Sequence, residues 1–274
     1  MLNVIDLQNL SPEIFTIDIG FMSFTLRWYA LAYIIGLLSA WQIIVRMIKQ
    51  PDLWKNNIAP MKKDNPEQLL TWMIFGVIIG GRLGFVLFYQ ANYYLHNPLE
   101  IPMVWKGGMS FHGGFIGVII SGIIFCHKNK LSILSVGDLI AVTTPIGIFL
   151  GRIANFINGE LFGKPSNLPW AVIFPNQNNQ DCGMNFVEIC SRHPSQLYEA
   201  LFEGLFLGLL LFWGAFFKSW LKLPGLSVGI FFTGYGASRC FIEIFRQPDN
   251  YYVTVSNPFG YICLLYTSPS PRDS

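Results

Sequence analysis

The sequence predicts an all-α fold, namely a polytopic bundle of transmembrane helices. Of the 274 residues, 52% are hydrophobic and only 12% are charged, whereas about 25% of the residues of a soluble domain are charged. The hydrophobic residues gather in runs close to the ~20 residues that a helix needs to cross a bilayer. Lipid is therefore the expected solvent for most of the chain, and a large soluble domain does not fit.

Six spans are predicted, separated by stretches rich in Pro, Asn, Lys and Gly. They are Leu26–Ile48, Leu69–Tyr89, Met109–Cys126, Val136–Ile157, Leu197–Phe217 and Leu226–Phe245. Glycines inside these runs, such as Gly80–Gly81 and Gly147–Gly151, let neighbouring helices approach closely. We therefore expect a tightly packed bundle.

The end of the chain departs from this pattern. Tyr261–Tyr266 starts like a further span, but the last twelve residues read CLLYTSPSPRDS and resemble translated adapter or vector sequence. We therefore expect one transmembrane domain over residues 1–262, a non-native tail over residues 263–274 and a seventh span that is truncated.

Basic residues predict the orientation, because cytoplasmic loops carry an excess of Lys and Arg. One set of alternate loops holds nine: Arg46, Lys49, Lys55, Lys62, Lys63, Lys128, Lys130, Lys218 and Lys222. The other set holds four: Lys106, Lys164, Arg192 and Arg246. The N-terminus and the long loop Phe162–His193 are therefore expected on the outer side of the membrane, which in a bacterium means the periplasmic or extracellular side.

Composition also excludes some functions. The net charge is only +2 and the lysines are scattered, so a nucleic-acid partner is not expected. No grouping of metal ligands is apparent, and neither a metal nor a cofactor is expected. Cys182 and Cys190 share the long polar loop, where a disulfide is an open alternative to free thiols.

Ionisable residues nevertheless occur inside or at the ends of the spans. A charge at membrane depth costs about 2.5–3.5 kcal/mol on insertion scales, so each needs a partner, a water-filled cavity or a function. These residues are Arg82, His112, Arg152, Glu160, Arg239, Glu243 and Arg246. All but Arg82 fall near the predicted outer ends of their spans.

The densest polar segment is Gly151–Glu160, which reads GRIANFINGE. Arg152, Asn155 and Gly159 share one helix face, and Asn158 adds a further amide. A guanidinium binds a phosphate through two parallel hydrogen bonds, and asparagine amides add donors. We favour an anion site over the alternative, a polar helix end that reaches to the membrane surface.

His112 lies between the pairs Gly107–Gly108 and Gly113–Gly114, which allow close backbone approach. A histidine there is either structural or a general base for a thiol or hydroxyl. Two interpretations are also open for Tyr29 in the Arg27–Trp28–Tyr29 run. It either belongs to an aromatic belt at the membrane interface or contacts a ligand.

The last two spans add two polar stripes. Gln196, Glu199 and Glu203 recur on one face that should point into the bundle, and for Glu203 we expect helix-binding hydrogen bonds. Arg239 and Glu243 are spaced to pair, with Arg246 on the same face. That set is either a structural salt bridge or, with Arg152, a two-pronged phosphate clamp.

Taken together, six blocks resemble the bacterial phosphatidylglycerol:prolipoprotein diacylglyceryl transferase family over about residues 15–262. The blocks are RWYALAY (27–33), GGRLGFVLFY (80–89), GGMSFHGG (107–114), GRIANFINGELFG (151–163), RHPSQLYEA (192–200) and SRCFIEIFRQPD (238–249). The resemblance implies a seven-span inner-membrane enzyme that moves the diacylglyceryl group of phosphatidylglycerol to the lipobox cysteine in the signal peptide of a preprolipoprotein. It works within membrane lipid, and we expect a monomer.

The resemblance also implies roles for single residues. Arg152 would bind the phosphatidylglycerol phosphate, Arg239 would assist it or hold the leaving phosphate, and His112 is the usual candidate base. The remaining catalytic candidates are Tyr29 and Glu243, and the remaining substrate-binding candidates are Asn155, Asn158, Glu160, Arg82, His193 and Arg246. Arg27 stands where many members have histidine, so we expect no catalytic role at that position.

A rival hypothesis is a transporter or flippase for an anionic lipid or a small anion, in which the same arginines line a pathway. It predicts inverted repeats or paired broken helices, and the sequence displays neither. A membrane scaffold without catalysis is a third alternative, but it leaves the embedded arginines and histidine without a purpose. The transferase hypothesis accounts for most of the observations.

Overall fold

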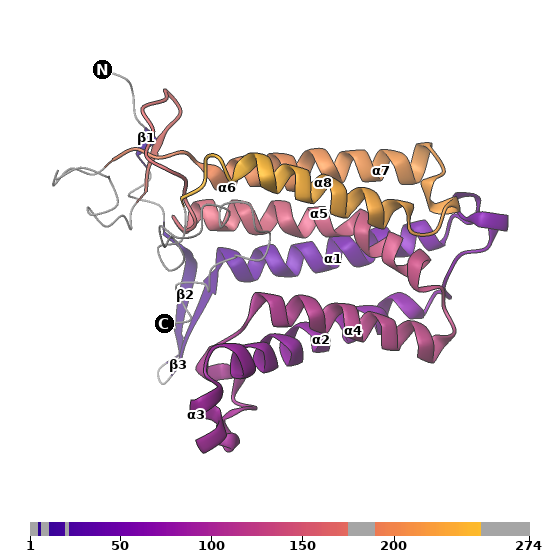
Figure 1. Cartoon of the computed structure of the whole chain (residues 1–274), viewed down its shortest axis with the longest axis horizontal. Helices are drawn as coiled ribbons and strands as arrows, with labels where there is room; N and C mark the ends of the chain where they lie inside the picture. Colours follow the sequence, from indigo (N-terminus) through magenta and orange to yellow (C-terminus); the bar gives the residue numbers. More distant parts are fainter. Residues whose placement is uncertain (1–4, 7–10, 20–21, 175–189, 248–274) are drawn as a thin grey trace, which may run out of the picture. The chain divides into compact units, whose positions relative to one another are not determined.

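The computed structural model describes residues 5–6, 11–19, 22–174 and 190–247. The chain divides into two compact units, which are treated separately below (Figure 1). Unit 1 holds the described residues of 1–40, 140–218 and 226–264, and unit 2 those of 41–139 and 219–225. Two long helices, α1 (Trp28–Ile48) and α5 (Ile133–Ile157), contribute residues to both units.

Five of the predicted spans are helices long and apolar enough to cross a membrane. Besides α1 and α5 they are α2 (Asn65–Phe88), α4 (Phe111–Asn129) and the continuous helix Ser195–Phe217. The sixth, α8 (Leu226–Ile242), is apolar but shorter. The predicted polytopic bundle of transmembrane helices is confirmed, while the expected seventh span and residues 263–274 lie outside the described residues.

The helix Ser195–Phe217 is not uniform. It consists of α6 (Ser195–Glu199), a π-helical stretch η6 (Ala200–Phe206) and α7 (Leu207–Phe217). A π-helical insertion is rare and is frequently found at functional sites. In unit 1 this helix packs on α5, because a Cβ added at Gly204 would lie 2.6 Å from the Cβ of Phe149.

Small residues bring α2 and α4 together in unit 2 (Figure 1). A Cβ at Gly80 would lie 2.4 Å from the carbonyl oxygen of Gly113, and one at Gly117 would lie 2.1 Å from that of Gly76. Real Cβ atoms essentially never come that close. The close packing predicted from Gly80–Gly81 is therefore present, and the glycines on both helices make it sterically possible.

Helix ends follow local chemistry. Ser110 caps α4 by accepting a hydrogen bond from the Gly113 N–H at 3.2 Å, so this helix begins two residues after the predicted Met109. The helix ends at Asn129 and is followed by Lys130, whose φ of 55° is left-handed. Helix α8 stops at Ile242 rather than at the predicted Phe245, because residues 243–245 form a turn.

Short elements complete the ends of the units. In unit 1, β2 (Glu13–Ile19) pairs antiparallel with β3 (Met22–Arg27), and β1 (Ile5–Asp6) pairs parallel with β4 (Val172–Ile173). In unit 2, α3 (Ala91–His96) follows α2. Single 3-10 turns are η1 (Pro51–Leu53), η2 (Lys55–Asn57), η3 (Pro98–Glu100), η4 (Val104–Lys106) and η7 (Trp220–Lys222). None of the four strands that the structure describes was predicted from the sequence.

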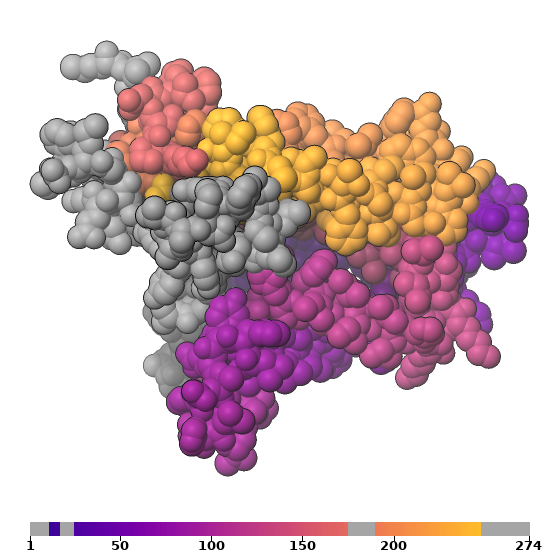
Figure 2. All heavy atoms as spheres, viewed as in Figure 1, coloured from indigo at the N-terminus to yellow at the C-terminus, as the bar shows by residue number. Residues whose placement is uncertain are grey.

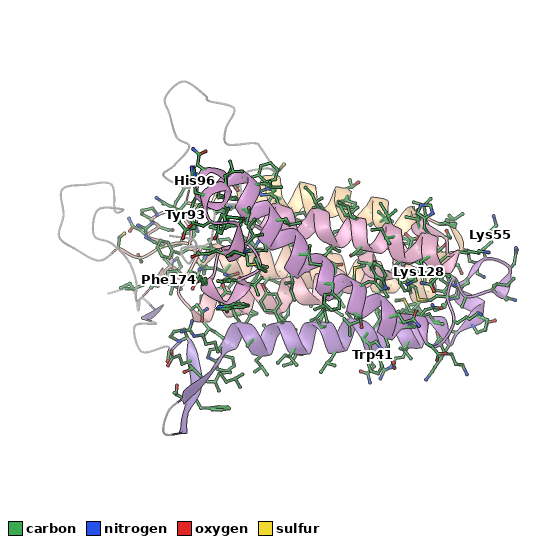
Figure 3. The ribbon with its side chains drawn as sticks, turned by 90° about the horizontal axis from the view of Figure 1, so that it is seen from below. Trp41, Lys55, Tyr93, His96, Lys128 and Phe174 are labelled. Carbon is green, nitrogen blue, oxygen red and sulfur yellow. The ribbon has the colours of Figure 1, made fainter. Side chains whose placement is uncertain are left out.

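Polar and apolar surfaces are arranged as a membrane requires. Tyr93 and His96 on α3 lie at one end of unit 2, and Lys55 and Lys128 lie at the other (Figure 3). Between these ends, large apolar side chains such as Phe75 and Leu87 are more than half exposed. In unit 1, α8 forms part of the surface, yellow in Figure 2. Two of its large side chains, Phe232 and Phe241, are about half exposed.

Candidate functional site

A buried carboxylate links two of the predicted arginines in unit 1. Arg152 on α5 places its Nε 2.6 Å from Oε2 of Glu199, and Arg239 on α8 places its Nη1 3.2 Å from Oε1 of the same residue. The Glu199 side chain is 1% exposed, while that of Arg152 is 19% exposed. Glu199 therefore holds the two guanidinium groups in a fixed relation, with Arg152 the more accessible of the two.

The pairing predicted on α8 is also present. Arg239 Nη2 lies 3.6 Å from Oε2 of Glu243, and Arg246 Nη1 lies 3.9 Å from the same oxygen. Arg246 is held at this end of the helix by a β-bridge between its backbone and Gly163. The cluster thus contains three arginines and three glutamates when Glu203 is included, and its formal charge is zero when all six groups are ionised.

Glu203 differs from its neighbours. It is fully buried in η6, and its nearest ionic contact is a 3.9 Å separation from Arg152 Nη2. Within the described part of the chain, neither carboxylate oxygen accepts a hydrogen bond. The expectation that it faces the interior is confirmed, but the expectation of helix-binding hydrogen bonds is wrong, because among the described residues its carboxylate makes only the 3.9 Å ion-pair contact with Arg152.

Tyr29, Asn155 and Glu160 meet in unit 1. The Tyr29 hydroxyl donates to Oε2 of Glu160 at 2.9 Å and accepts a hydrogen bond from the Asn155 amide. The backbone carbonyl of Glu160 accepts from Nε2 of Gln196 at 2.6 Å. Residues from three helices and one turn thus form one polar chain, which places the first turn of α1 beside the end of α5.

Some buried polar atoms beside this chain lack a partner. Asn158 is 4% exposed, yet neither its amide nitrogen nor its amide oxygen makes a hydrogen bond to any residue that the structure describes. The same holds for Oε1 of Gln196. Buried polar groups normally find partners, so such atoms point to a bound water or ligand.

The segment before α6 packs on aromatic rings. His193 contacts Phe245 with ring centroids 5.2 Å apart, and its Nδ1 lies 3.2 Å from the Tyr198 hydroxyl. Burial, with a smaller effect from the positive charge of Lys164, lowers the pKa of His193. The neutral imidazole is therefore favoured, which suits a hydrogen-bonding or packing role better than a charge contact with an anion.

Arg192 is a structural residue that the sequence analysis did not single out. It is fully buried, donates from Nη1 to the Gly163 carbonyl at 3.3 Å and to Gln247 at 3.2 Å, and lies over the Phe162 ring. Its backbone pairs with Val172 and Pro165. The feature of the sequence that could have indicated its importance is its position beside His193 in the RHPSQLYEA block.

Unit 2 holds the other two site candidates. The Arg82 guanidinium donates to the backbone carbonyls of Glu100, Ile101, Gly107 and Gly108. His112, in the first turn of α4, contacts the Phe111 ring. In the part of unit 2 that the structure describes, its imidazole makes no hydrogen bond. Four of the five N–H groups of Arg82 are thus occupied by backbone, which disfavours the expected substrate contact.

What this arrangement can do is bind an anion. Arg152 and Arg239 present guanidinium groups of the kind that bind a phosphate, and both also pair with the Glu199 carboxylate. Among the residues described, no group of three or more His, Cys, Asp or Glu side chains could hold a metal ion. Fold and site together define a multi-pass membrane protein with a buried, arginine-containing polar site.

Comparison with known proteins identifies the family. The family model described as prolipoprotein diacylglyceryl transferase matches residues 15–267. A phosphatidylglycerol–prolipoprotein diacylglyceryl transferase of Cereibacter sphaeroides is 52% identical over 259 residues, which cover 94% of this chain and 88% of the relative. The proteins of the same name from Ruegeria pomeroyi and Rhizobium meliloti are 54% and 44% identical, over 94% and 90% of this chain and 87% and 84% of their own lengths.

The chain therefore belongs to the prolipoprotein diacylglyceryl transferase family and is an enzyme. The resemblance expected from the six sequence blocks is confirmed.

Proposed function

We propose that this protein transfers the diacylglyceryl group of phosphatidylglycerol to the thiol of the lipobox cysteine of a preprolipoprotein. The names of its relatives support this reaction. The observation that carries it in the structure is the pair of arginines, Arg152 and Arg239, held by the single carboxylate of Glu199. A phosphodiester is the substrate group that two such guanidinium groups would recognise.

The reaction requires one bond to form and one to break. The cysteine sulfur attacks the carbon of the diacylglyceryl group that is bound to the phosphate oxygen, and a carbon–sulfur bond forms. The bond between that carbon and the phosphate oxygen breaks, and its electron pair goes to the oxygen. Glycerol 1-phosphate leaves. Because the departing phosphate gains negative charge, fixed positive groups stabilise the transition state more than the ground state.

The thiol must lose its proton for this attack. A free cysteine has a pKa of about 8.5, so at neutral pH a base or a positive field is needed to produce the thiolate. We assign proton acceptance to His112, a role that the family resemblance supports. In this proposal Arg152 and Arg239 supply the guanidinium groups that meet the phosphate, and Glu243 pairs with Arg239.

In this proposal the remaining candidate residues bind or orient the donor lipid, phosphatidylglycerol. Tyr29, Asn155 and Glu160 form a hydrogen-bonded chain that can orient the glycerol headgroup, and Asn158 contributes a buried amide that makes no hydrogen bond to any described residue. Arg246 supports the charge of the cluster through Glu243, while His193 closes the site on the side of Phe245.

We propose that the protein lies in the bacterial inner membrane with its N-terminus in the periplasm, and the excess of Lys and Arg in one set of loops supports this orientation. Lys55 and Lys128 lie at the end of unit 2 opposite α3 (Figure 3), which is consistent with a cytoplasmic end and a periplasmic end. The partners are phosphatidylglycerol and the signal peptide with its lipobox cysteine, and we propose that the monomer is the active form.

The test is transfer of a labelled diacylglyceryl group from phosphatidylglycerol to a lipobox peptide in proteoliposomes. The wild-type protein should label the cysteine peptide and leave a matched peptide with serine at that position unlabelled. Arg152→Ala should lose transfer while remaining folded in the membrane. Movement of labelled lipid between leaflets without any peptide labelling would instead support the flippase hypothesis and overturn this proposal.

A further inference from the structure

We infer that Arg82 is a positioning residue that fixes the turn before α4 and thereby sets the place of His112. This inference rests on the proposed function, in which His112 accepts the thiol proton. The geometry that carries it lies wholly within unit 2.

The Arg82 side chain is buried, and its hydrogen bonds go to the protein backbone. The residue is 3% exposed. Its Nε donates to the Ile101 carbonyl at 2.8 Å and its Nη2 to the Glu100 carbonyl at 2.8 Å. Its Nη1 donates to the carbonyls of Gly107 and Gly108. One guanidinium group therefore ties together two points of the segment between α3 and α4.

Gly107 and Gly108 explain why the conformation of this segment needs to be restrained by hydrogen bonds. Gly107 and Gly108 have φ values of 84° and 76°, a region that glycine enters easily and other residues rarely adopt. Two consecutive glycines leave the chain free to take many other conformations. Hydrogen bonds from Arg82 to both carbonyls select one of them.

Helix α2 also holds the turn from its own backbone. The Ser110 N–H donates to the carbonyl of Gly81, the residue next to Arg82, at 2.8 Å. The Phe85 ring lies against Gly108, where an added Cβ would come within 2.4 Å of a ring carbon. Residues 81, 82 and 85 of one helix thus contact residues 107, 108 and 110 of the segment that leads into α4.

The path from this turn to His112 is two residues long. Ser110 caps α4 through its hydroxyl, which accepts from the Gly113 N–H at 3.2 Å, and its carbonyl accepts from the Gly114 N–H at 2.9 Å. His112 lies between these bonded residues in the first helical turn. Displacement of the Gly107–Ser110 turn would therefore move the imidazole.

A substrate role for Arg82 fits less well. Carbonyls of described residues occupy four of its five N–H groups, and its Cζ lies 5.1 Å from the centre of the Tyr94 ring. The nearby Glu100 carboxylate pairs with Lys106 at 3.0 Å instead. The N–H groups of this buried guanidinium thus donate to backbone carbonyl oxygens.

The experiment compares the wild-type chain with Arg82→Lys in phosphatidylglycerol proteoliposomes. A lysine keeps the charge but cannot reproduce the planar fork that reaches four carbonyls. We expect kcat to fall by about 10- to 100-fold, because misplacement of a reacting group by about 1 Å can cost that much. The KM for phosphatidylglycerol should stay within about twofold of wild type, because an interaction that affects only the transition state lowers kcat alone.

Hydrogen–deuterium exchange provides the readout that does not depend on activity. In Arg82→Lys, the amides of the peptide that contains residues 107–112 should exchange faster than in wild type, whereas peptides from unit 1 should be unchanged. Ser110→Ala, which removes the cap and keeps Arg82, should shift exchange and kcat in the same direction. Arg152→Lys is the matched control, and it should raise the KM for phosphatidylglycerol with wild-type exchange at residues 107–112.

Two results would overturn the inference. A raised KM for phosphatidylglycerol with unchanged kcat in Arg82→Lys would make Arg82 a substrate ligand, and unchanged exchange at residues 107–112 would show that it does not hold the turn. If wild-type protein transfers no label, the proposed function fails, but the exchange measurement still decides whether Arg82 orders the turn.

Discussion

The Nε atom of Arg152 lies 2.6 Å from Oε2 of Glu199, although the two residues come from different helices of unit 1. Glu199 also pairs with Arg239. One carboxylate thereby sets the spacing of two guanidinium groups, and a phosphate that binds Arg152 must share this cation with Glu199.

Glu199→Gln should damage both the fold and the site. Removal of one partner from a buried ion pair costs up to about 3–5 kcal/mol, and here Glu203 and Glu243 still compensate part of the charge of the two arginines. We expect a lower unfolding temperature in detergent and a higher KM for phosphatidylglycerol. Wild-type stability together with wild-type KM would show that Glu199 does not organise the arginines.

Glu203→Gln is the matched comparison, one helical turn along the same helix. Its carboxylate accepts no hydrogen bond from the described residues and stands 3.9 Å from Arg152. The amide has the same shape, and the change removes no hydrogen bond, which would contribute about 1 kcal/mol. We expect unfolding temperature and transfer rate to change far less than in Glu199→Gln. Equal losses in both variants would mean that the charge of Glu203 is also required.

Tyr29→Phe should uncouple α1 from the polar end of α5. The change removes the hydroxyl that accepts from the buried Asn155 amide and donates to Glu160, and loss of the partner of a buried polar group costs about 1–3 kcal/mol. If this free energy is added to the activation barrier, we expect the rate of transfer to fall by roughly tenfold to a hundredfold. A double-mutant cycle with Glu160→Gln measures the coupling, and strictly additive effects would contradict a direct bond.

Gly117→Ala should destabilise unit 2. The added Cβ would lie 2.1 Å from the Gly76 carbonyl oxygen, so α2 and α4 would have to separate. Overpacking of this kind typically costs about 1–3 kcal/mol. Gly114→Ala, three residues earlier on α4, is the control because its Cβ would meet nothing closer than 3.6 Å. Thermal unfolding in detergent should distinguish the two variants.

The pH dependence of stability should contain a contribution from His193. Burial lowers the pKa of this residue in the folded protein, while in the unfolded chain it is about 6.5. Between these two values the unfolded state binds more protons, so the free energy of unfolding falls as the pH falls from about 6.5 to the folded pKa. Below the folded pKa this contribution no longer changes.

His193→Gln should remove that part of the pH dependence. The measurement is the free energy of unfolding in detergent between about pH 5 and 7.5, a range that brackets the unfolded pKa of histidine. His96→Gln, on α3 of unit 2, controls for the loss of an imidazole elsewhere. An unchanged slope in His193→Gln would show that this histidine is not the responsible group.

Some of the site could be predicted because its signals are local. A charge at membrane depth is costly wherever the chain folds, so Arg152, Arg239 and Glu243 stood out before any contact was known. The pairing of Arg239 with Glu243 needed only helical spacing. The strands β2 and β3 were missed, since an apolar run at a helix start does not reveal a β-hairpin by composition.

The sequence by itself determined that this protein crosses a membrane, where its spans lie and which family its motifs indicate, because hydrophobic length and embedded charge depend on composition along the chain. Only the tertiary structure decided that Glu199 bridges two arginines, that Tyr29 joins Asn155 to Glu160, and that backbone carbonyls occupy Arg82. These relations join residues up to 131 positions apart. Helix packing brings them together, and the spacing of residues along one helix contains no information about its neighbours.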